Sequence, residues 1–168
     1  MTAPCPGPFS PGYRAAGVLL HVTSLPSRHG IGDLGPPAFT WIDRLRDAGL
    51  AWWQGLPVGP TGWGDSPYQA LSSFAGNGLL LSPDRLVEDG LIRRRDVEDE
   101  YFPALSVHYE SVIPFKRRLL DTAWRAFRAG ERPDLKAPFE QFCQRQSGWL
   151  EDYALFRARR SASAAHIT

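Results

Sequence analysis

Two short apolar runs separated by one amphipathic segment constrain the fold of this 168-residue chain more than any other feature. The runs at residues 17–21 (G-V-L-L-H) and 52–58 (W-W-Q-G-L-P-V) have the length and composition of buried strands. Between them, Pro36 suits the first turn of a helix and Gly49 its end. The residues expected on one face of this helix are Phe39, Ile42, Leu45 and Ala48. The order strand, helix, strand predicts two parallel strands joined by a right-handed crossover, and therefore an α/β fold.

The second run opens into a long loop, residues 59–77, in which aromatic and short polar side chains alternate with glycine and proline. A sugar ring has apolar C–H faces and a rim of hydroxyl groups, so its site needs aromatic platforms beside polar donors and acceptors. The candidate sugar-binding residues in this loop are Trp63, Asp65, Ser66, Tyr68, Gln69 and Asn77. A second explanation stays open, in which Trp63 and Tyr68 only pack against the end of the strands.

Composition excludes several classes of partner. Nineteen Lys and Arg against 18 Asp and Glu leave a formal charge of +1, which favours neither nucleic acid nor an anionic membrane as partner. The first 13 residues read as a flexible lead-in without the pattern of a signal peptide, which predicts a cytoplasmic protein. Cys5 and Cys143 are too few and too differently placed for a disulfide framework or a cysteine metal site.

The second half of the chain is predicted to be mainly helical. Residues 77–82 read as an extended apolar piece, and residues 83–90 as a short helix or turn. Helical periodicity marks residues 114–129, and Pro138 is placed to start another helix. The two long helices are expected to form a hairpin over the strands, with an aromatic core of Phe115, Trp124, Phe127, Phe139, Phe142, Trp149, Tyr153 and Phe156.

Several separate blocks of sequence occur in an order that is specific to one family. They read R-A-A-G-V-L-L-H-V-T-S-L-P-S, G-I-G-D-L-G, W-Q-G-L-P-V-G-P-T-G-W-G-D-S-P-Y-Q, F-A-G-N and W-L-E-D-Y-A-L-F. Together they span about residues 14–159 and resemble the N-terminal part of 4-α-glucanotransferases, the amylomaltase or disproportionating-enzyme family. The resemblance implies the N-terminal part of a (β/α)8 TIM barrel with an inserted helical subdomain, truncated before the barrel closes. The domains expected on this basis are a lead-in (1–13), the first βαβ unit with the substrate loop (14–76), an inserted segment with a helical hairpin (77–159) and a divergent tail (160–168).

The resemblance also implies an activity. Members of this family transfer an α-1,4-glucan segment to the 4-hydroxyl of another glucan or of glucose by a retaining double displacement, with neither metal nor organic cofactor. The expected partners are therefore α-1,4-glucans and maltooligosaccharides, while the oligomeric state stays open. Because the family's carboxylate nucleophile and acid/base align beyond residue 168, this chain alone is expected to transfer no glucan. The alternative is a non-catalytic maltooligosaccharide-binding or non-functional fragment.

The same resemblance implies roles for individual residues of the loop. Tyr68 matches a tyrosine that lines the donor sugar site, and Asp65, Ser66 and Gln69 flank it in the same loop. Trp63 stands where some relatives have a tyrosine in a secondary glucan-binding patch. The substitution keeps an aromatic platform but changes its shape.

Residues near the first strand give two further hypotheses. His21 is expected near the floor of the sugar site, with a satisfied buried histidine as the alternative. Asp33 and Asp65 follow the first and second predicted strands, where barrel enzymes place their chemistry. A catalytic pair of these two carboxylates stays open as a minor alternative, although Asp33 lies between glycines in a turn, where aspartate commonly bonds its own backbone.

Overall fold

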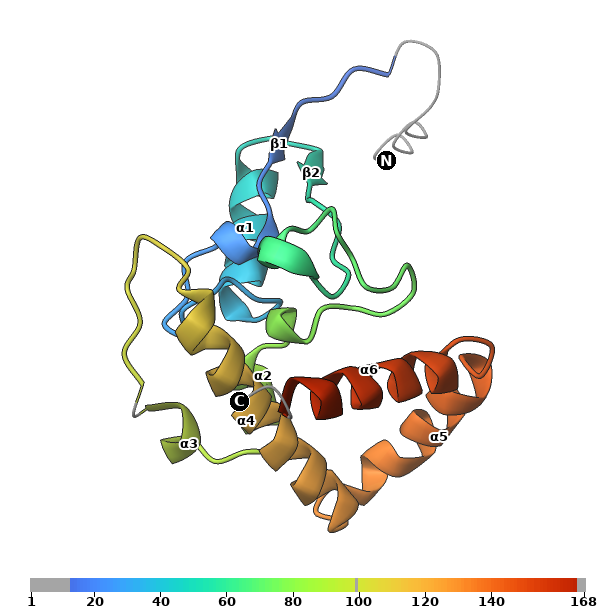
Figure 1. Cartoon of the computed structure of the whole chain (residues 1–168). Coiled ribbons are helices and arrows are strands. Elements are labelled where there is room, and N and C mark those ends of the chain that lie inside the picture. Colours follow the sequence, from blue (N-terminus) through green and yellow to red (C-terminus); the bar gives the residue numbers. More distant parts are fainter. Residues whose placement is uncertain (1–12, 99, 166–168) are drawn as a thin grey trace.

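The strand–helix–strand unit is present and parallel. The structure is a computed structural model that describes residues 13–98 and 100–165, the last four through their backbone alone (Figure 1). Strand β1 (Gly17–Leu19) pairs with β2 (Trp52–Gln54) in parallel, with Val18 opposite Trp53. Helix α1 (Pro36–Asp47) makes the crossover between them and contacts β2. The prediction of a parallel pair joined by a helix is therefore confirmed.

Both strands are shorter than predicted, and the residues after Gln54 explain why. The last ladder bond runs from the Leu20 N–H to the Gln54 carbonyl at 3.0 Å. Beyond it, the Leu56 N–H donates to Nδ1 of His21 at 3.2 Å instead of to a strand carbonyl. Pro57 has no N–H with which to continue the ladder.

Helix α1 presents a different face to the strands from the one predicted. Ala38 and Leu45 are buried, and the Trp41 ring meets the Trp53 ring edge-on with centroids 6.5 Å apart. Phe39 and Ile42, which were expected on the inner face, are about half exposed. The predicted stripe is confirmed at Leu45 and wrong at Phe39 and Ile42, because the Trp41 ring packs against β2 in their place.

The rest of the described chain is helical, with short 3₁₀ turns between the elements. The helices are α2 (Pro83–Glu88), α3 (Arg95–Glu98), α4 (Tyr109–Arg128), α5 (Lys136–Arg145) and α6 (Leu150–Ala165). The 3₁₀ turns are Val22–Ser24, Trp63–Asp65, Gly78–Leu80 and Pro133–Leu135. Figure 1 shows α4, α5 and α6 as three consecutive sides of a triangle below the strands in this view.

Three of the predicted boundaries are corrected. Residues 77–82 are not extended, because the Asn77 side chain accepts the Leu79 N–H at 3.0 Å and so caps a 3₁₀ turn. Helix α4 begins five residues before Pro114, because Val112 in its first turn is fully buried and anchors that turn in the core. The helix expected from Pro138 is two helices, α5 and α6, which break near Gly148.

Two hydrophobic cores hold these elements. One lies beneath the strands and contains Val22, Leu25, Ala38 and Leu80. The other surrounds α4 and contains Ile31, Ile92, Val97, Phe102, Val112, Phe115, Leu119 and Ala123. Helix α4 packs against α2 and the Gly78–Leu80 turn, so the expectation that the helical hairpin covers the strands is wrong.

Most of the aromatic residues expected in the core are not buried. Phe115 is 2% exposed, whereas Trp124, Phe139, Phe142 and Phe156 are each 40–45% exposed. Trp124, Phe139 and Phe142 line an apolar groove between α4 and α5. Within the described residues nothing covers this groove, which is why helical periodicity overestimated the core.

A buried histidine lies beside the α4 core. His29 is 2% exposed, and its Nε2 lies 3.2 Å from Oδ2 of Asp84. The other carboxylate oxygen, Oδ1, accepts a hydrogen bond from Arg28 at 2.6 Å. Its ring stacks on Phe115 with centroids 6.2 Å apart. Burial lowers the pKa of His29, an effect that Asp84 partly offsets and that the positive charges of Arg28 and Lys116 reinforce. Burial would raise the pKa of Asp84, but Arg28 and His29 outweigh it and lower that pKa.

These pKa shifts predict a loss of stability in mild acid. Because the unfolded chain protonates His29 more readily than the folded chain does, the free energy of unfolding is expected to fall as pH drops from 7 to 5, by at most about 1.4 kcal/mol per pH unit for each such histidine. The pKa of His21 is also lowered by burial and contributes in the same direction. Urea titrations at several pH values check this, and His29→Gln is expected to show a shallower slope. An identical slope in that variant would contradict the assignment.

Candidate functional site

The candidate site lies where both parallel strands end. The loops after β1 and β2 leave from the same edge of the sheet, because the two strands run in the same direction. In open and closed α/β folds the chemistry gathers at this edge. The predicted substrate loop therefore begins at the place where such folds bind ligands.

The structure holds this loop at both of its ends. The Leu71 N–H donates to the Pro60 carbonyl at 2.9 Å, and the Asn77 N–H donates to the Val58 carbonyl at 2.8 Å. Gly62 is required here, because a Cβ at this position would lie 2.6 Å from the Gln69 carbonyl oxygen. These contacts leave the segment between Gly62 and Gln69 as a projecting tip.

The two aromatic residues of the tip face outwards. Trp63 is 86% exposed and Tyr68 is 73% exposed, so neither ring packs in the core of the described residues. The Tyr68 N–H donates to the Ser66 hydroxyl at 3.3 Å, which keeps Ser66 within the turn that carries the ring. Among the described residues, neither ring therefore packs at the end of the strands, and the faces of both rings are open.

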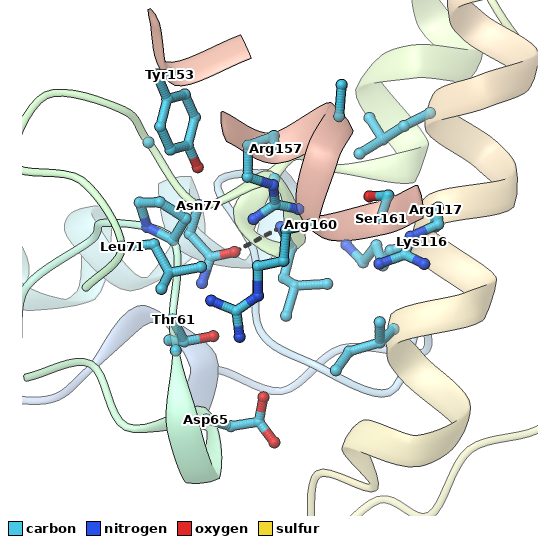
Figure 2. A pocket seen from close by; sticks show the side chains of 18 of the residues that line it. Thr61, Asp65, Leu71, Asn77, Lys116, Arg117, Tyr153, Arg157, Arg160 and Ser161 are labelled. Carbon is cyan, nitrogen blue, oxygen red and sulfur yellow. Dashed lines mark hydrogen bonds between the residues drawn. The ribbon is translucent and has the colours of Figure 1, made fainter. Parts of the chain in front are cut away.

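A cavity of about 720 Å³ lies between this loop, α4 and α6. Two of the predicted residues line it, Asp65 and Asn77. The residues that sequence reasoning missed are Arg117 of α4 and Tyr153, Arg157 and Arg160 of α6. Figure 2 shows Arg157 and Arg160 reaching into the space between the loop and α4. The guanidinium and hydroxyl groups, together with the acceptors of Asp65 and Asn77, suit a ligand rich in hydroxyl groups.

The other predicted residues lie around this cavity rather than in its wall. Trp63, Ser66, Tyr68 and Gln69 belong to the projecting tip, and Gln69 is exposed. His21 lies under the loop, partly buried, with Nδ1 accepting the Leu56 N–H. The structure thus brings Asp65 and Asn77 together at the cavity and leaves the remaining five residues at its rim or below the loop.

The environment of His21 favours its neutral form. Burial lowers the pKa of this imidazole, and Nδ1 is an acceptor only when it carries no proton. The proton of the neutral ring is then on Nε2, which makes no hydrogen bond within the described residues. The hydrogen bond to Nδ1 agrees with the alternative of a satisfied, partly buried histidine. The Nε2–H group is left as one donor near the carboxyl end of β1.

Asp33 does not face Asp65 as a catalytic partner. Its Oδ2 lies 3.1 Å from Nζ of Lys116, and both side chains are 2% exposed. Because this carboxylate is buried and paired with Lys116, a ligand in the cavity cannot contact it. The minor alternative of an Asp33–Asp65 acid/base pair is therefore excluded, and Asp33 bonds a distant lysine rather than its own turn.

Tyr109, at the start of α4, is a second residue that sequence reasoning missed. Burial raises the pKa of its phenol, and the nearby carboxylate of Asp65 raises it further, while a hydrogen bond with Thr23 lowers it. Tyr109 therefore lies close to both the end of β1 and the substrate loop. No local pattern in the sequence marks this residue.

Metal sites and membrane spans are absent from the part of the chain that the structure describes. Within residues 13–98 and 100–165, no three His, Cys, Asp or Glu side chains are grouped so that they would hold a metal ion. In the same residues, no helix has the length and apolar character needed to cross a membrane. Cys143 is a free, partly buried thiol on α5.

The fold and site define the class of the protein: an α/β protein with parallel strands and a loop of exposed aromatic and polar residues at their carboxyl edge. A sequence model of the 4-alpha-glucanotransferase family matches residues 20–166. The chain belongs to this family, and the resemblance stated from its sequence blocks is confirmed.

Individual relatives agree with this assignment. The chain is 47% identical over 150 residues to the 4-alpha-glucanotransferase of Synechocystis sp. (strain ATCC 27184 / PCC 6803 / Kazusa), covering 89% of this chain and 30% of that protein. It is 45% identical over 149 residues to the 4-alpha-glucanotransferase of Thermus thermophilus, covering 89% and 29%. The solved amylomaltase from Streptococcus agalactiae in complex with acarbose matches with a TM-score of 0.82 and 36% identity, covering 89% of this chain and 30% of that one. The chain therefore spans about 30% of the length of these relatives.

Proposed function

We propose that this chain forms the first part of the (β/α)8 barrel of a 4-alpha-glucanotransferase, with residues 77–159 as an inserted helical segment. The support is the family, the parallel strands β1 and β2 with their helical crossover, and the match to a solved amylomaltase. The proposed reaction transfers an α-1,4-glucan segment to the 4-hydroxyl of another glucan or of glucose.

The proposed mechanism is a retaining double displacement. One carboxylate attacks the anomeric carbon, while a carboxylic acid protonates the leaving oxygen and later takes the proton of the acceptor hydroxyl. On the family resemblance, we assign these two groups to a part of the relatives that this chain, which spans about 30% of their length, does not cover. The described residues would then supply sugar binding, and the reaction would need neither a metal nor an organic cofactor.

The observation that carries the proposal is the pair of exposed rings on a loop that is fixed at both ends. We propose that Tyr68 stacks on a glucose unit of the donor and that Trp63 binds a more distant part of the glucan. Asp65, Ser66, Gln69 and Asn77 would bond the hydroxyl groups beside these rings, and His21 would offer its Nε2 proton from below. The ligands would be α-1,4-glucans and maltooligosaccharides, in the cytoplasm.

The test is the binding of maltoheptaose to the chain, measured by titration calorimetry. Replacing both rings, Trp63→Ala with Tyr68→Ala, is expected to weaken binding at least about tenfold, because about 1.4 kcal/mol of lost contact corresponds to that factor. Tyr101→Ala is the matched control, since Tyr101 is an aromatic residue that is 92% exposed and lies outside the cavity. Equal affinity in the double variant and the wild type would refute the roles proposed for the two rings.

The purified wild-type chain also separates the alternatives. A non-catalytic binding fragment would bind maltoheptaose and release no glucose from maltotriose, whereas a non-functional one would do neither. Release of glucose together with longer oligosaccharides would show that the chain transfers glucan without further residues. That result would place the carboxylates within residues 1–168.

A further inference from the structure

The most completely buried charges of the described chain form one pair, Asp33 with Lys116. Oδ2 of Asp33 and Nζ of Lys116 are 3.1 Å apart, each side chain is 2% exposed, and 83 positions separate them in the sequence. Removing two charges from water is costly, so such a pair persists only where geometry and further hydrogen bonds compensate.

Lys116 makes a second bond that extends the pair to the substrate loop. Its Nζ donates to the Leu81 carbonyl at 2.8 Å, in the segment that leaves the loop. Next to this bond, the Leu34 N–H donates to the Leu80 carbonyl at 2.9 Å. One ammonium group therefore joins α4, the loop after β1 and the end of the substrate loop.

The surroundings of Asp33 are closely packed. A Cβ at Gly35 would lie 2.7 Å from Oδ1 of Asp33 and 2.1 Å from the Ser82 hydroxyl oxygen. Ser82 is 4% exposed, and its hydroxyl has no hydrogen-bond partner within the described residues. The carboxylate is thus held between α4 and the start of α2.

The bond to Leu81 lies four residues from Asn77, the predicted sugar-binding residue that caps the Gly78–Leu80 turn. Lys116 also forms part of the cavity wall that Asp65 and Asn77 line. A displacement of Leu81 would therefore be passed to Asn77 and to the hydrogen bond between Asn77 and Val58 that closes the loop.

We propose that Lys116 is a positioning residue: it fixes the end of the substrate loop against the loop that follows β1 and so sets the place of the sugar-binding residues. The inference rests on the proposed function and deepens it. Lys116 acts through Leu81 and Asn77, with its ammonium already bonded to Asp33 and Leu81.

The competing explanation is an ion pair that only stabilises the core, and a double variant separates the two. Lys116→Met with Asp33→Asn removes both charges at similar side-chain volume, which avoids leaving one buried charge without a partner. The double variant is expected to unfold near the wild-type urea midpoint and to bind maltoheptaose at least about tenfold more weakly, since the bond to Leu81 is lost. Wild-type affinity in a folded double variant would overturn the proposal.

If the double variant does not fold, one single variant tests the proposal and a second serves as its control. Asp33→Asn leaves Lys116 bonded to Leu81 but deprives its buried charge of a carboxylate, so it is expected to lose stability. Under conditions where this variant is still folded, it is expected to retain binding within about threefold, which corresponds to less than about 1 kcal/mol. If binding is instead lost in Asp33→Asn, the role belongs to the charge pair and the proposal fails. Lys136→Met is the matched surface control, because Lys136 lies on α5 with its nearest carboxylate oxygen, Oε1 of Glu140, at 4.0 Å.

Amide hydrogen exchange separates this inference from the proposed function. If the wild-type chain does not bind maltoheptaose, the proposed sugar binding is refuted. Amide exchange can still test whether Lys116 fixes the end of the substrate loop. The positioning role would be supported by faster exchange at the amides of Asn77, Leu79 and Leu80 in the double variant, with unchanged exchange at the amides of α4. Equal exchange at these three amides would overturn it.

Discussion

Replacing Phe115 by alanine is expected to lower the free energy of unfolding by about 3–5 kcal/mol. Phe115 is 2% exposed at the centre of the α4 core. Its ring lies 5.1 Å from the Phe102 ring and 6.2 Å from the His29 ring, measured between centroids. The truncation removes these contacts and leaves a cavity that close-packed neighbours fill only in part.

Urea unfolding followed by circular dichroism measures this effect. Phe156→Ala is the matched control, because Phe156 is 44% exposed on α6 and loses the same atoms. Its cost is expected to be about 1–1.5 kcal/mol, since a half-exposed ring has about half as much burial to lose as a fully buried one. Equal losses in the two variants would contradict the placement of the core around α4.

Replacing Gly32 by alanine is expected to cost about 3 kcal/mol or more, because the added methyl group overpacks against backbone atoms that do not rotate away. A Cβ at this position would lie 2.0 Å from the Val22 carbonyl oxygen and 2.8 Å from both the N and the O of Leu25. The Gly32 N–H also donates to the Thr23 carbonyl at 3.1 Å. The substitution therefore has to separate the loop carrying Asp33 from the turn that follows β1.

Gly55→Ala is the natural comparison for this change. Nothing lies within 4 Å of the position that a Cβ would take at Gly55, so its cost is expected to stay within about 0.5 kcal/mol. Thermal unfolding of the two variants under one set of conditions gives the difference. A Gly32→Ala protein as stable as Gly55→Ala would show that the two segments do not approach as closely as the structure has them.

The candidate site was only partly accessible from the sequence. The chemistry of the 59–77 loop follows from its own residues, and the exposure of Trp63 and Tyr68 agrees with a binding role. The roles of the individual loop residues stay predictions. The arginines of α6 at the cavity and the approach of Tyr109 to Asp65 were not predicted, because no local pattern brings residues so far apart in the sequence to one place.

The helical half shows the limit of periodicity. A repeat of apolar residues identified α4 and marked its buried stripe, including Phe115 and Leu119. The same argument placed Trp124 and Phe139 in the core, although both are more than one-third exposed. Periodicity reports which residues share a face, whereas burial depends on whether another element covers that face.

The amino-acid sequence is enough to derive the parallel strand–helix–strand unit, the chemistry of the loop after β2 and the family. Each of these depends on short local stretches of sequence and on their order along the chain. The folded chain was needed to establish that α1 turns Trp41 towards β2 and that Asp33 is bonded to Lys116 rather than to its own turn. Local conformation depends on neighbouring residues, while the partner of a buried charge depends on which distant segments fold against it. The ion pair that joins the loop after β1, the end of the substrate loop and α4 is therefore a property of the tertiary structure.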